Sequence, residues 1–357
     1  MFIYLVIWCI VAFLAIVGCK NHKYRKICTF CIIMVIALFA GLRYERWSDW
    51  GPYYSLFMNA GESSRDVEIG FRGLLYISRH TLGNYNVFLC VIYIIVLCLY
   101  LREYRYSADA FAPFCLLVFL STGILSSGGM RQFIAGCVTY YSIRFIREKK
   151  LIPFLITILV AFSIHRSAIV FFPIYWIDKI RIKLKPFLIL TVVGVFVGRT
   201  GLFQRLINLL MPYIYRIGGV SFSYRAQLYI NQSVELNILS LGTIKRFLIM
   251  IMLLYVQYTN KSEENNYEDC NVDIYINLYS VGFILALFLP GTFARLGGYF
   301  YSAEPVSEAL IISNAHNRNN KLIEFLFFSI LSLIIWIHTL NTFYPELLIP
   351  YRSCLFV

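Results

Sequence analysis

A histidine and an arginine stand side by side in the stretch FSIHRSAIVFF, residues 162–172. The surrounding apolar run from Leu151 to Ile177 carries no other charged residue. A charged side chain at bilayer depth is unfavourable by at least ~2.5–3.5 kcal/mol, so this pair requires a wet surrounding lined by protein. We therefore expect the chain to turn at His165, where the imidazole can exchange a proton near neutral pH beside Arg166.

A second polar stretch, GLRYERWSDWGPYY at residues 41–54, follows the second apolar run. Arg43 lies at the expected membrane edge close to Asp49, and Tyr53 follows a Gly-Pro pair. Aromatic residues are typical of the membrane interface, but this preference does not account for an arginine beside an acid. We interpret Arg43 and Tyr53 as candidate substrate-binding residues and Asp49 as a candidate catalytic residue.

Two further stretches place charged residues at the start of helices. DVEIGFRGLLYISRHTLGNYNVF, residues 66–88, predicts a helix in the membrane interface, with Glu68 near its start as a cap or a site residue. SSGGMRQFIAG, residues 126–136, places Arg131 in the first turns of a long apolar run. Free backbone amides at a helix N-terminus, joined by an arginine, form a good anion seat.

The elements that position these residues follow from the composition. The chain has 357 residues, of which 59% are hydrophobic and 14% charged, against roughly 45–50% and about 25% in a soluble domain. These values predict an all-α, polytopic membrane protein folded as a single domain over residues 1–357. Apolar runs predict about twelve spans: 2–19, 27–42, 85–101, 109–125, 128–146, 151–164, 166–177, 186–198, 242–258, 272–289, 299–314 and 322–340.

The basic residues predict the orientation of the spans. The short loops KNHKYRK, REYR, RFIREKK and DKIRIKLK fall on alternate connections, which should therefore be cytoplasmic. The opposite face holds two long connections, 43–84 and 199–241, and fourteen of the arginines. A guanidinium binds phosphate bidentately, so those arginines that do not snorkel to lipid headgroups should line an anion-binding cavity. Arg225, in SFSYRAQLY, and Arg295, in GTFARLGGYF, join this face.

Several functional classes are disfavoured. The sequence has no P-loop, no dinucleotide-binding glycine motif, no H-E-x-x-H and no G-x-S-x-G. Its ten cysteines are scattered through apolar segments, so we expect no bound metal, no cofactor and no disulfide framework. The net charge of +13 reflects membrane topology and anion binding, not a nucleic-acid surface.

Taken in order, GLRYERWSDWGPYY, EIGFRGLLY, GGMRQFIA, SIHRSAIVFFPIYW, RLGGYF and a terminal IPYRS resemble the EpsG/Wzy family of bacterial polysaccharide polymerases. One departure is Trp47-Ser48-Asp49-Trp50, where the family pattern has a Gly-Thr-Asp-Tyr-like stretch; Asp49 still matches the acid. The resemblance implies a helical bundle similar to the GT-C-type glycosyltransferases. It implies transfer of a growing glycan from undecaprenyl pyrophosphate to a new lipid-linked unit, at the periplasmic face of the inner membrane. A chain-length regulator protein is a possible partner.

The resemblance, taken with the chemistry above, assigns a role to each candidate. Preorganised donors stabilise the charge that develops on a leaving pyrophosphate, and an acceptor hydroxyl must lose a proton as it attacks. The predicted catalytic residues are His165, Asp49 and Arg131, with His165 or Asp49 as the base. The predicted substrate-binding residues are Arg43, Arg166, Arg225, Arg295, Glu68 and Tyr53.

Two other functions fit a polytopic membrane protein. A membrane O-acyltransferase that modifies surface glycan would need polar groups extending toward the cytoplasm to admit an acyl donor. A flippase for lipid-linked sugars would carry charges through the full depth of both halves. Here the polar residues gather at one end of the apolar runs, which favours the polymerase.

Overall fold

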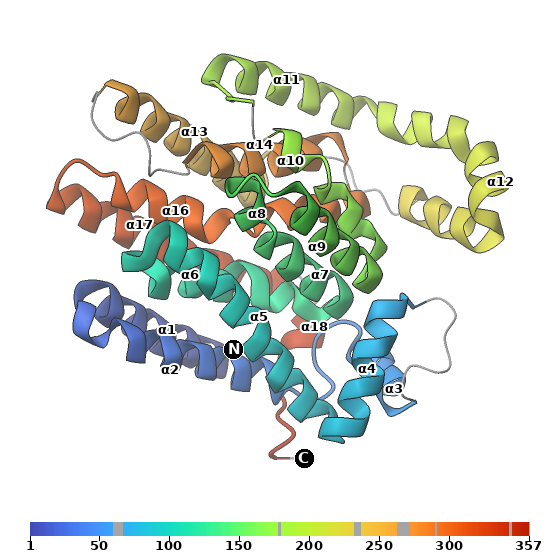
Figure 1. Cartoon of the computed structure of the whole chain (residues 1–357), viewed down its shortest axis with the longest axis horizontal. Coiled ribbons are helices and arrows are strands. Elements are labelled where there is room, and N and C mark those ends of the chain that lie inside the picture. Colours follow the sequence, from blue (N-terminus) through green and yellow to red (C-terminus); the bar gives the residue numbers. More distant parts are fainter. Residues whose placement is uncertain are drawn as a thin grey trace. The chain divides into compact units, whose positions relative to one another are not determined.

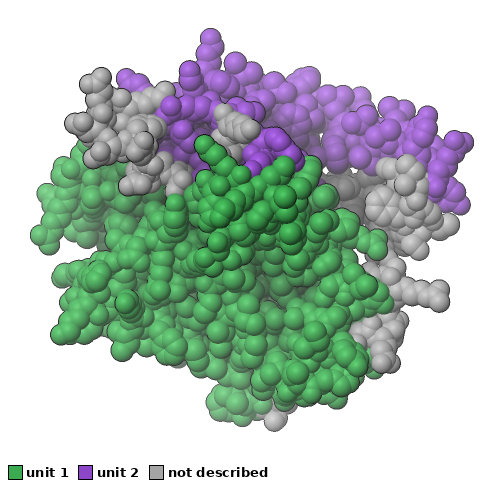
Figure 2. All heavy atoms as spheres, viewed as in Figure 1, with its two compact units in different colours: residues 1–172, 304–357 green, residues 173–303 purple. Residues whose placement is uncertain are grey.

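The computed structural model describes residues 1–59, 67–177, 180–231, 237–262, 272–289, 291–342 and 345–356, and the part it describes is built from helices (Figure 1). It divides into two compact units, shown in Figure 2. Unit 1 consists of Met1–Phe172 and Glu304–Val357, and unit 2 of Pro173–Ala303. The single-domain organisation expected from the sequence stays a prediction.

Unit 1 begins with two long helices, α1 (Phe2–Lys20) and α2 (His22–Gly41), which pack along each other. They are separated by Asn21, whose side chain accepts a hydrogen bond from the Lys23 N–H and so caps the second helix. The next long helix, α5 (Tyr85–Ala108), packs against α2, while α6 (Ala112–Phe119) packs against both α1 and α2. Their shared interior is apolar and closely packed, as the absence of exposure at Ile36, Phe88 and Leu117 indicates.

Shorter elements surround this group of helices. Helix α3 (Trp50–Met58) packs on α4 (Ile69–Leu82), and α4 packs on α5 and on α9 (Leu151–Ile164). The remaining elements of unit 1 are η1 (Asp109–Phe111), η2 (Leu120–Ile124), η3 (Leu125–Gly128), α7 (Met130–Tyr141), α8 (Ile143–Arg147), η4 (Arg166–Phe171), α16 (Glu304–Ser313), α17 (Arg318–Thr342) and α18 (Pro345–Leu348).

Unit 2 is organised around α14 (Val272–Phe288), which packs against α11 (Leu184–Thr200), α13 (Leu241–Ser262) and η5 (Gly291–Gly297). Gly201 adopts a left-handed conformation with φ 65°, and at this residue α11 gives way to α12 with a bend of 62°. The other elements of this unit are α10 (Ile174–Ile177), α12 (Leu202–Asn231) and α15 (Gly298–Tyr301).

The number of long apolar helices is smaller than the sequence predicts. Among the described residues, five helical segments are long and apolar enough to cross a membrane, or six if α11 and the start of α12 form one bent span. They are Phe2–Lys20, His22–Gly41, Tyr85–Gly128, Leu241–Thr259 and Arg318–Thr342. The structure therefore supports a polytopic helical membrane protein but not the twelve predicted spans.

The difference has a physical cause. Hydropathy detects apolar runs, whereas a span needs about 20 helical residues to cross ~30 Å of hydrocarbon. Helix α9 has 14 residues and is about 21 Å long, and the apolar run beyond it begins as the separate element η4. The predicted turn at His165 is confirmed, because α9 ends at Ile164 and His165 is extended, with φ −152° and ψ 119°.

The two long predicted connections are also largely helical. The first contains α3 and α4, so the helix predicted within residues 66–88 is confirmed. The second, predicted as a connection over 199–241, holds the whole of the 30-residue helix α12. This helix keeps its course through Pro212.

A candidate active site around Glu68

Glu68 stands immediately before α4, at the N-cap position, with φ −60° and ψ 144°. Its side chain makes no capping bond, so both carboxylate oxygens are available to other partners. Close packing brings this end of α4 against the end of α9: a Cβ on Gly70 would lie only 2.8 Å from the backbone oxygen of Ser163. Glycine is thus needed at position 70 for Glu68 to approach the residues that follow α9.

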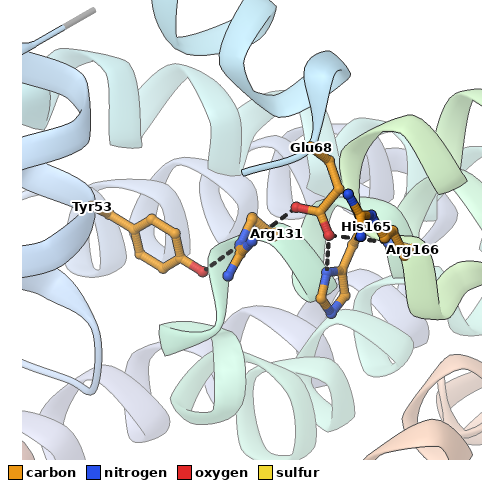
Figure 3. Close-up of polar contacts among 5 residues, drawn as sticks. All are labelled: Tyr53, Glu68, Arg131, His165 and Arg166. Atoms are coloured by element: carbon orange, nitrogen blue, oxygen red, sulfur yellow. Dashed lines mark hydrogen bonds and ion pairs between the residues drawn. The ribbon is translucent and has the colours of Figure 1, made fainter. Parts of the chain in front are cut away.

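The Glu68 carboxylate joins three chain segments that are distant in the sequence (Figure 3). Its Oε2 accepts a hydrogen bond of 2.8 Å from Nη1 of Arg131, which forms an ion pair. Its Oε1 lies 3.1 Å from Nδ1 of His165 and 3.3 Å from the backbone nitrogen of Arg166. Because an ionised carboxylate only accepts, Nδ1 of His165 must carry the proton. In the neutral tautomer with this proton, the lone pair that can accept a proton is on the other ring nitrogen, Nε2.

Arg131 is held from a second side by α3. Its Nε donates a hydrogen bond of 3.3 Å to the Tyr53 hydroxyl, while Nη1 binds Glu68. These contacts use two of the five N–H groups of the guanidinium. The Arg131 side chain keeps 28% of its surface exposed and the Glu68 side chain only 8%. The carboxylate therefore fixes the orientation of Arg131 and leaves part of the cation open to a ligand.

The electrostatics keep Glu68 ionised. Burial raises the pKa of the carboxyl, but the hydrogen bond from His165 and the positive charge of Arg131 outweigh burial and lower the pKa to about 2. Burial also raises the pKa of the Tyr53 hydroxyl, and here the neighbouring Arg131 only reduces the effect. At neutral pH the cluster thus contains a carboxylate, a guanidinium and a neutral phenol.

Arg43 lies in a different environment. It is 1% exposed, and its Nη1 donates to the Ala40 carbonyl at 2.6 Å and to the Tyr93 hydroxyl at 2.7 Å. Its guanidinium also lies over the Trp47 ring, 4.0 Å from the centroid. These contacts give Arg43 a stabilising role in the bundle, and its predicted role in substrate binding stays a prediction.

Asp49 and Arg166 lie beside the cluster without completing it. Asp49 is exposed at the N-cap of α3, one turn before Tyr53, whose N–H donates to the Asp49 carbonyl at 3.1 Å. The Arg166 side chain is also exposed, while its backbone N–H reaches Glu68. Both side chains can therefore contact a ligand while the hydrogen bonds of the cluster stay intact.

Arg225 and Arg295 belong to unit 2, in α12 and η5 respectively. The side chain of Arg225 lies outside the described part, and Arg295 is exposed within its own unit. The structure therefore brings together Tyr53, Glu68, Arg131, His165 and the backbone of Arg166, and leaves the roles of Arg225 and Arg295 as predictions.

The sequence reasoning missed the central place of Glu68, which it treated as a substrate-binding residue. It also missed Gly70 as a positioning residue. A Cβ on Gly128 would lie 2.4 Å from the Ser48 hydroxyl, so the turn before Arg131 packs directly on the stretch before α3. The glycines themselves were visible signals, but their partners are far away in the sequence.

These features define a helical membrane protein with an arginine–carboxylate–histidine site assembled from three segments of one compact unit. The chain belongs to the EpsG family, which matches residues 26–353 and so covers nearly the whole chain, including every residue of the site. EpsG-like proteins are Wzy-type polymerases, and membership indicates a polysaccharide polymerase-like function with lipid-linked oligosaccharide substrates. No curated protein matches the chain, and no solved structure does.

Proposed function

We propose that this protein is a polysaccharide polymerase of the bacterial inner membrane, with its active site on the periplasmic side. It transfers the growing glycan from undecaprenyl pyrophosphate onto a new lipid-linked repeat unit. The proposal rests on the family and on the convergence of Arg131 and His165 upon one buried carboxylate. A GT-C-like arrangement of the helices and a partner that regulates chain length remain predictions within it.

The reaction needs a base on one side of the transferred carbon and an anion-binding group on the other. An acceptor hydroxyl attacks C1 of the donor sugar, and the new C–O bond forms as the bond from C1 to the pyrophosphate oxygen breaks. The electron pair leaves with undecaprenyl pyrophosphate, and Nε2 of His165 takes the hydroxyl proton. A neutral imidazole fixed by a carboxylate on its other nitrogen is suited to this task.

Arg131 supplies the charge that the leaving pyrophosphate needs. Three of its N–H groups remain after the bonds to Glu68 and Tyr53, and a planar guanidinium binds phosphate oxygens bidentately. Arg166 contributes a second cation from the residue next to His165. Donors that are already oriented before the reaction stabilise the developing charge without further reorganisation.

The remaining predicted residues have supporting roles in this scheme. Asp49 faces the acceptor sugar, and the exposed ring of Tyr54, which stacks on Trp50 with centroids 5.0 Å apart, offers an aromatic surface beside it. Arg225 and Arg295 keep their predicted role in binding the donor pyrophosphate. Reaction through these side chains alone requires no metal.

A deletion strain provides the test. We expect surface glycan from the strain to consist of single repeat units, and His165→Gln to fail to restore long chains although the protein reaches the membrane. The matched control is His80→Gln, because His80 is an exposed histidine of α4 whose Nδ1 lies 2.8 Å from the Tyr76 carbonyl. Glycan of normal length that lacks acyl groups would indicate an acyltransferase instead, and units trapped inside the cell would indicate a flippase.

A further inference from the structure

Residues 346–354, here named the strap, run alongside residues 42–49 within unit 1, although about 300 residues separate the two segments. Arg43 and Ser353 form an antiparallel β-bridge. Four hydrogen bonds join the segments: Cys354 N–H to the Leu42 carbonyl at 2.9 Å, Tyr44 N–H to the Arg352 carbonyl at 3.0 Å, Trp47 N–H to the Leu347 carbonyl at 2.9 Å, and Arg46 Nη1 to the Glu346 carbonyl at 2.9 Å.

The strap is itself anchored to the long helices. The Tyr351 ring stacks on Phe39 of α2, with centroids 5.1 Å apart, and its hydroxyl donates to the Phe39 carbonyl at 2.8 Å. The Tyr4 hydroxyl of α1 donates to the Leu348 carbonyl. The strap therefore forms a fixed surface against which residues 42–49 can be held.

The segment held by the strap has an unfavourable backbone conformation. Glu45, Trp47 and Asp49 have φ angles of 48°, 73° and 60°, in the left-handed region that residues with a Cβ rarely adopt. Such residues persist only where the surrounding structure holds them, and they gather at functional sites. Here the strap holds the segment through the hydrogen bonds above, and Ser48 of the segment also packs closely against Gly128.

This segment leads directly into the candidate active site. Asp49 is the N-cap of α3, and Tyr53 follows one turn later with its hydroxyl 3.3 Å from Nε of Arg131. Gly128 stands three residues before Arg131. A displacement of residues 45–49 would therefore move both Asp49 and the phenol that orients the guanidinium.

We propose that the strap is a positioning element of the active site, which holds residues 45–49 in their strained conformation and thereby sets Asp49, Tyr53 and Arg131 in place. Its residues do not touch the substrate. The inference rests on the proposed function for its activity readout, whereas its structural half stands independently of that function.

Cys354→Pro is the sharpest test. Cys354 is the second residue of a turn closed by the hydrogen bond from Phe356 N–H to the Ser353 carbonyl, a position where proline is favoured. The preceding residue, Ser353, lies in a β-bridge, which also suits proline. The substitution thus removes the donor to Leu42 with little other change. Cys354→Ala keeps the N–H and is the matched control.

Hydrogen exchange of the purified protein gives the structural readout. Loss of one backbone hydrogen bond should speed amide exchange in residues 43–58 by about two- to tenfold in Cys354→Pro and leave it unchanged in Cys354→Ala. A chain that ends at Pro350 loses the bridge, Tyr351 and two of the four bonds, and should show a larger increase. Unchanged exchange in both shortened and proline variants would overturn the inference.

Polymerisation by membranes supplied with lipid-linked units gives the functional readout. Cys354→Pro should lower kcat by about two- to tenfold while KM and the temperature of unfolding stay near wild type, because the site is misaligned but the fold is kept. Faster exchange with unchanged kcat would overturn the positioning role. If the deletion strain still makes long glycan, the proposed function fails, and the exchange measurement still decides whether the strap holds residues 45–49.

Discussion

Replacement of Glu68 by glutamine removes a charge but keeps the size of the side chain. The carboxyl pKa falls from its ordinary value of 4.5 to about 2 in the folded protein. Since one pKa unit corresponds to about 1.4 kcal/mol, the fold favours the ionised form by about 3 kcal/mol. This is an upper value, because Arg131 and His165 are about a quarter exposed and solvent weakens the attraction.

The amide of glutamine can replace only part of this network. Its oxygen can accept from Nη1 of Arg131 or from Nδ1 of His165, while its NH₂ group repels the other donor. The imidazole then loses the partner that fixes Nδ1–H, and Nε2 is no longer held as the base. A positioned general base contributes about 10²–10⁴-fold, so we expect Glu68→Gln to lower the polymerisation rate by a factor in this range.

The assay measures glycan length and initial rate in membranes that carry equal amounts of each variant. Glu148→Gln is the matched control, since the Glu148 carboxylate also forms ion pairs, with Arg144 at 3.5 Å and Lys150 at 2.9 Å, but takes no part in the cluster. We expect it to behave like wild type. A wild-type rate in Glu68→Gln would refute the assignment of Glu68 as the residue that positions Arg131 and His165.

Three further outcomes follow from the same geometry. Arg131→Lys should abolish long glycan, since a lysine offers no planar fork to bind Glu68, Tyr53 and phosphate together. Arg79→Lys should not, because the Arg79 guanidinium donates to the Gly83 carbonyl at the end of α4 and lies over the Phe57 ring, outside the cluster. Gly70→Ala should destabilise the protein by about 1–3 kcal/mol and impair polymerisation, because the added Cβ would meet the Ser163 backbone. Its control is Gly73→Ala, where the added Cβ has open space. This variant should be neutral or stabilise the protein by about 0.5–1 kcal/mol in thermal unfolding. Because the pKa of Glu68 is lower in the folded protein, the ionised carboxylate stabilises the fold above pH 4.5, and this stabilisation is lost as pH falls toward about 2. The unfolding temperatures of wild type and Glu68→Gln should therefore converge as pH falls through this window.

The local features of the site could be read from the sequence. A charged pair inside an apolar run indicated a chain turn at His165, since charge at that depth is unfavourable, and the helix does end there. Arg131 was expected in the first turns of a long apolar run, and α7 begins at Met130. Tyr53, Glu68, Arg131 and His165 were all among the candidates, and the structure brings these four into one cluster.

The long-range features could not be read in this way. Glu68 was weighed between a capping role and a role in the site. It makes no capping bond, because packing of Gly70 on Ser163 brings its carboxylate to Arg131 and His165, and its contact with substrate stays a prediction. The number of spans was overestimated because apolar runs do not reveal where a helix is broken into short elements. The pairing of residues 42–49 with the strap depends on backbone groups, which hydrophobic and charge patterns do not report.

A carboxylate at the centre of a site that binds a diphosphate requires an explanation, because like charges repel. Both Glu68 oxygens are engaged by Arg131, by His165 and by the Arg166 N–H, so the negative charge is screened on every side by donors. With Arg131 and Arg166 both cationic, the cluster keeps a net positive charge even when His165 is neutral. Without Glu68, His165 would lie beside two guanidinium groups with no anion to fix its Nδ1 proton. One buried carboxylate thus keeps the imidazole oriented as a base next to the cations that hold the leaving group.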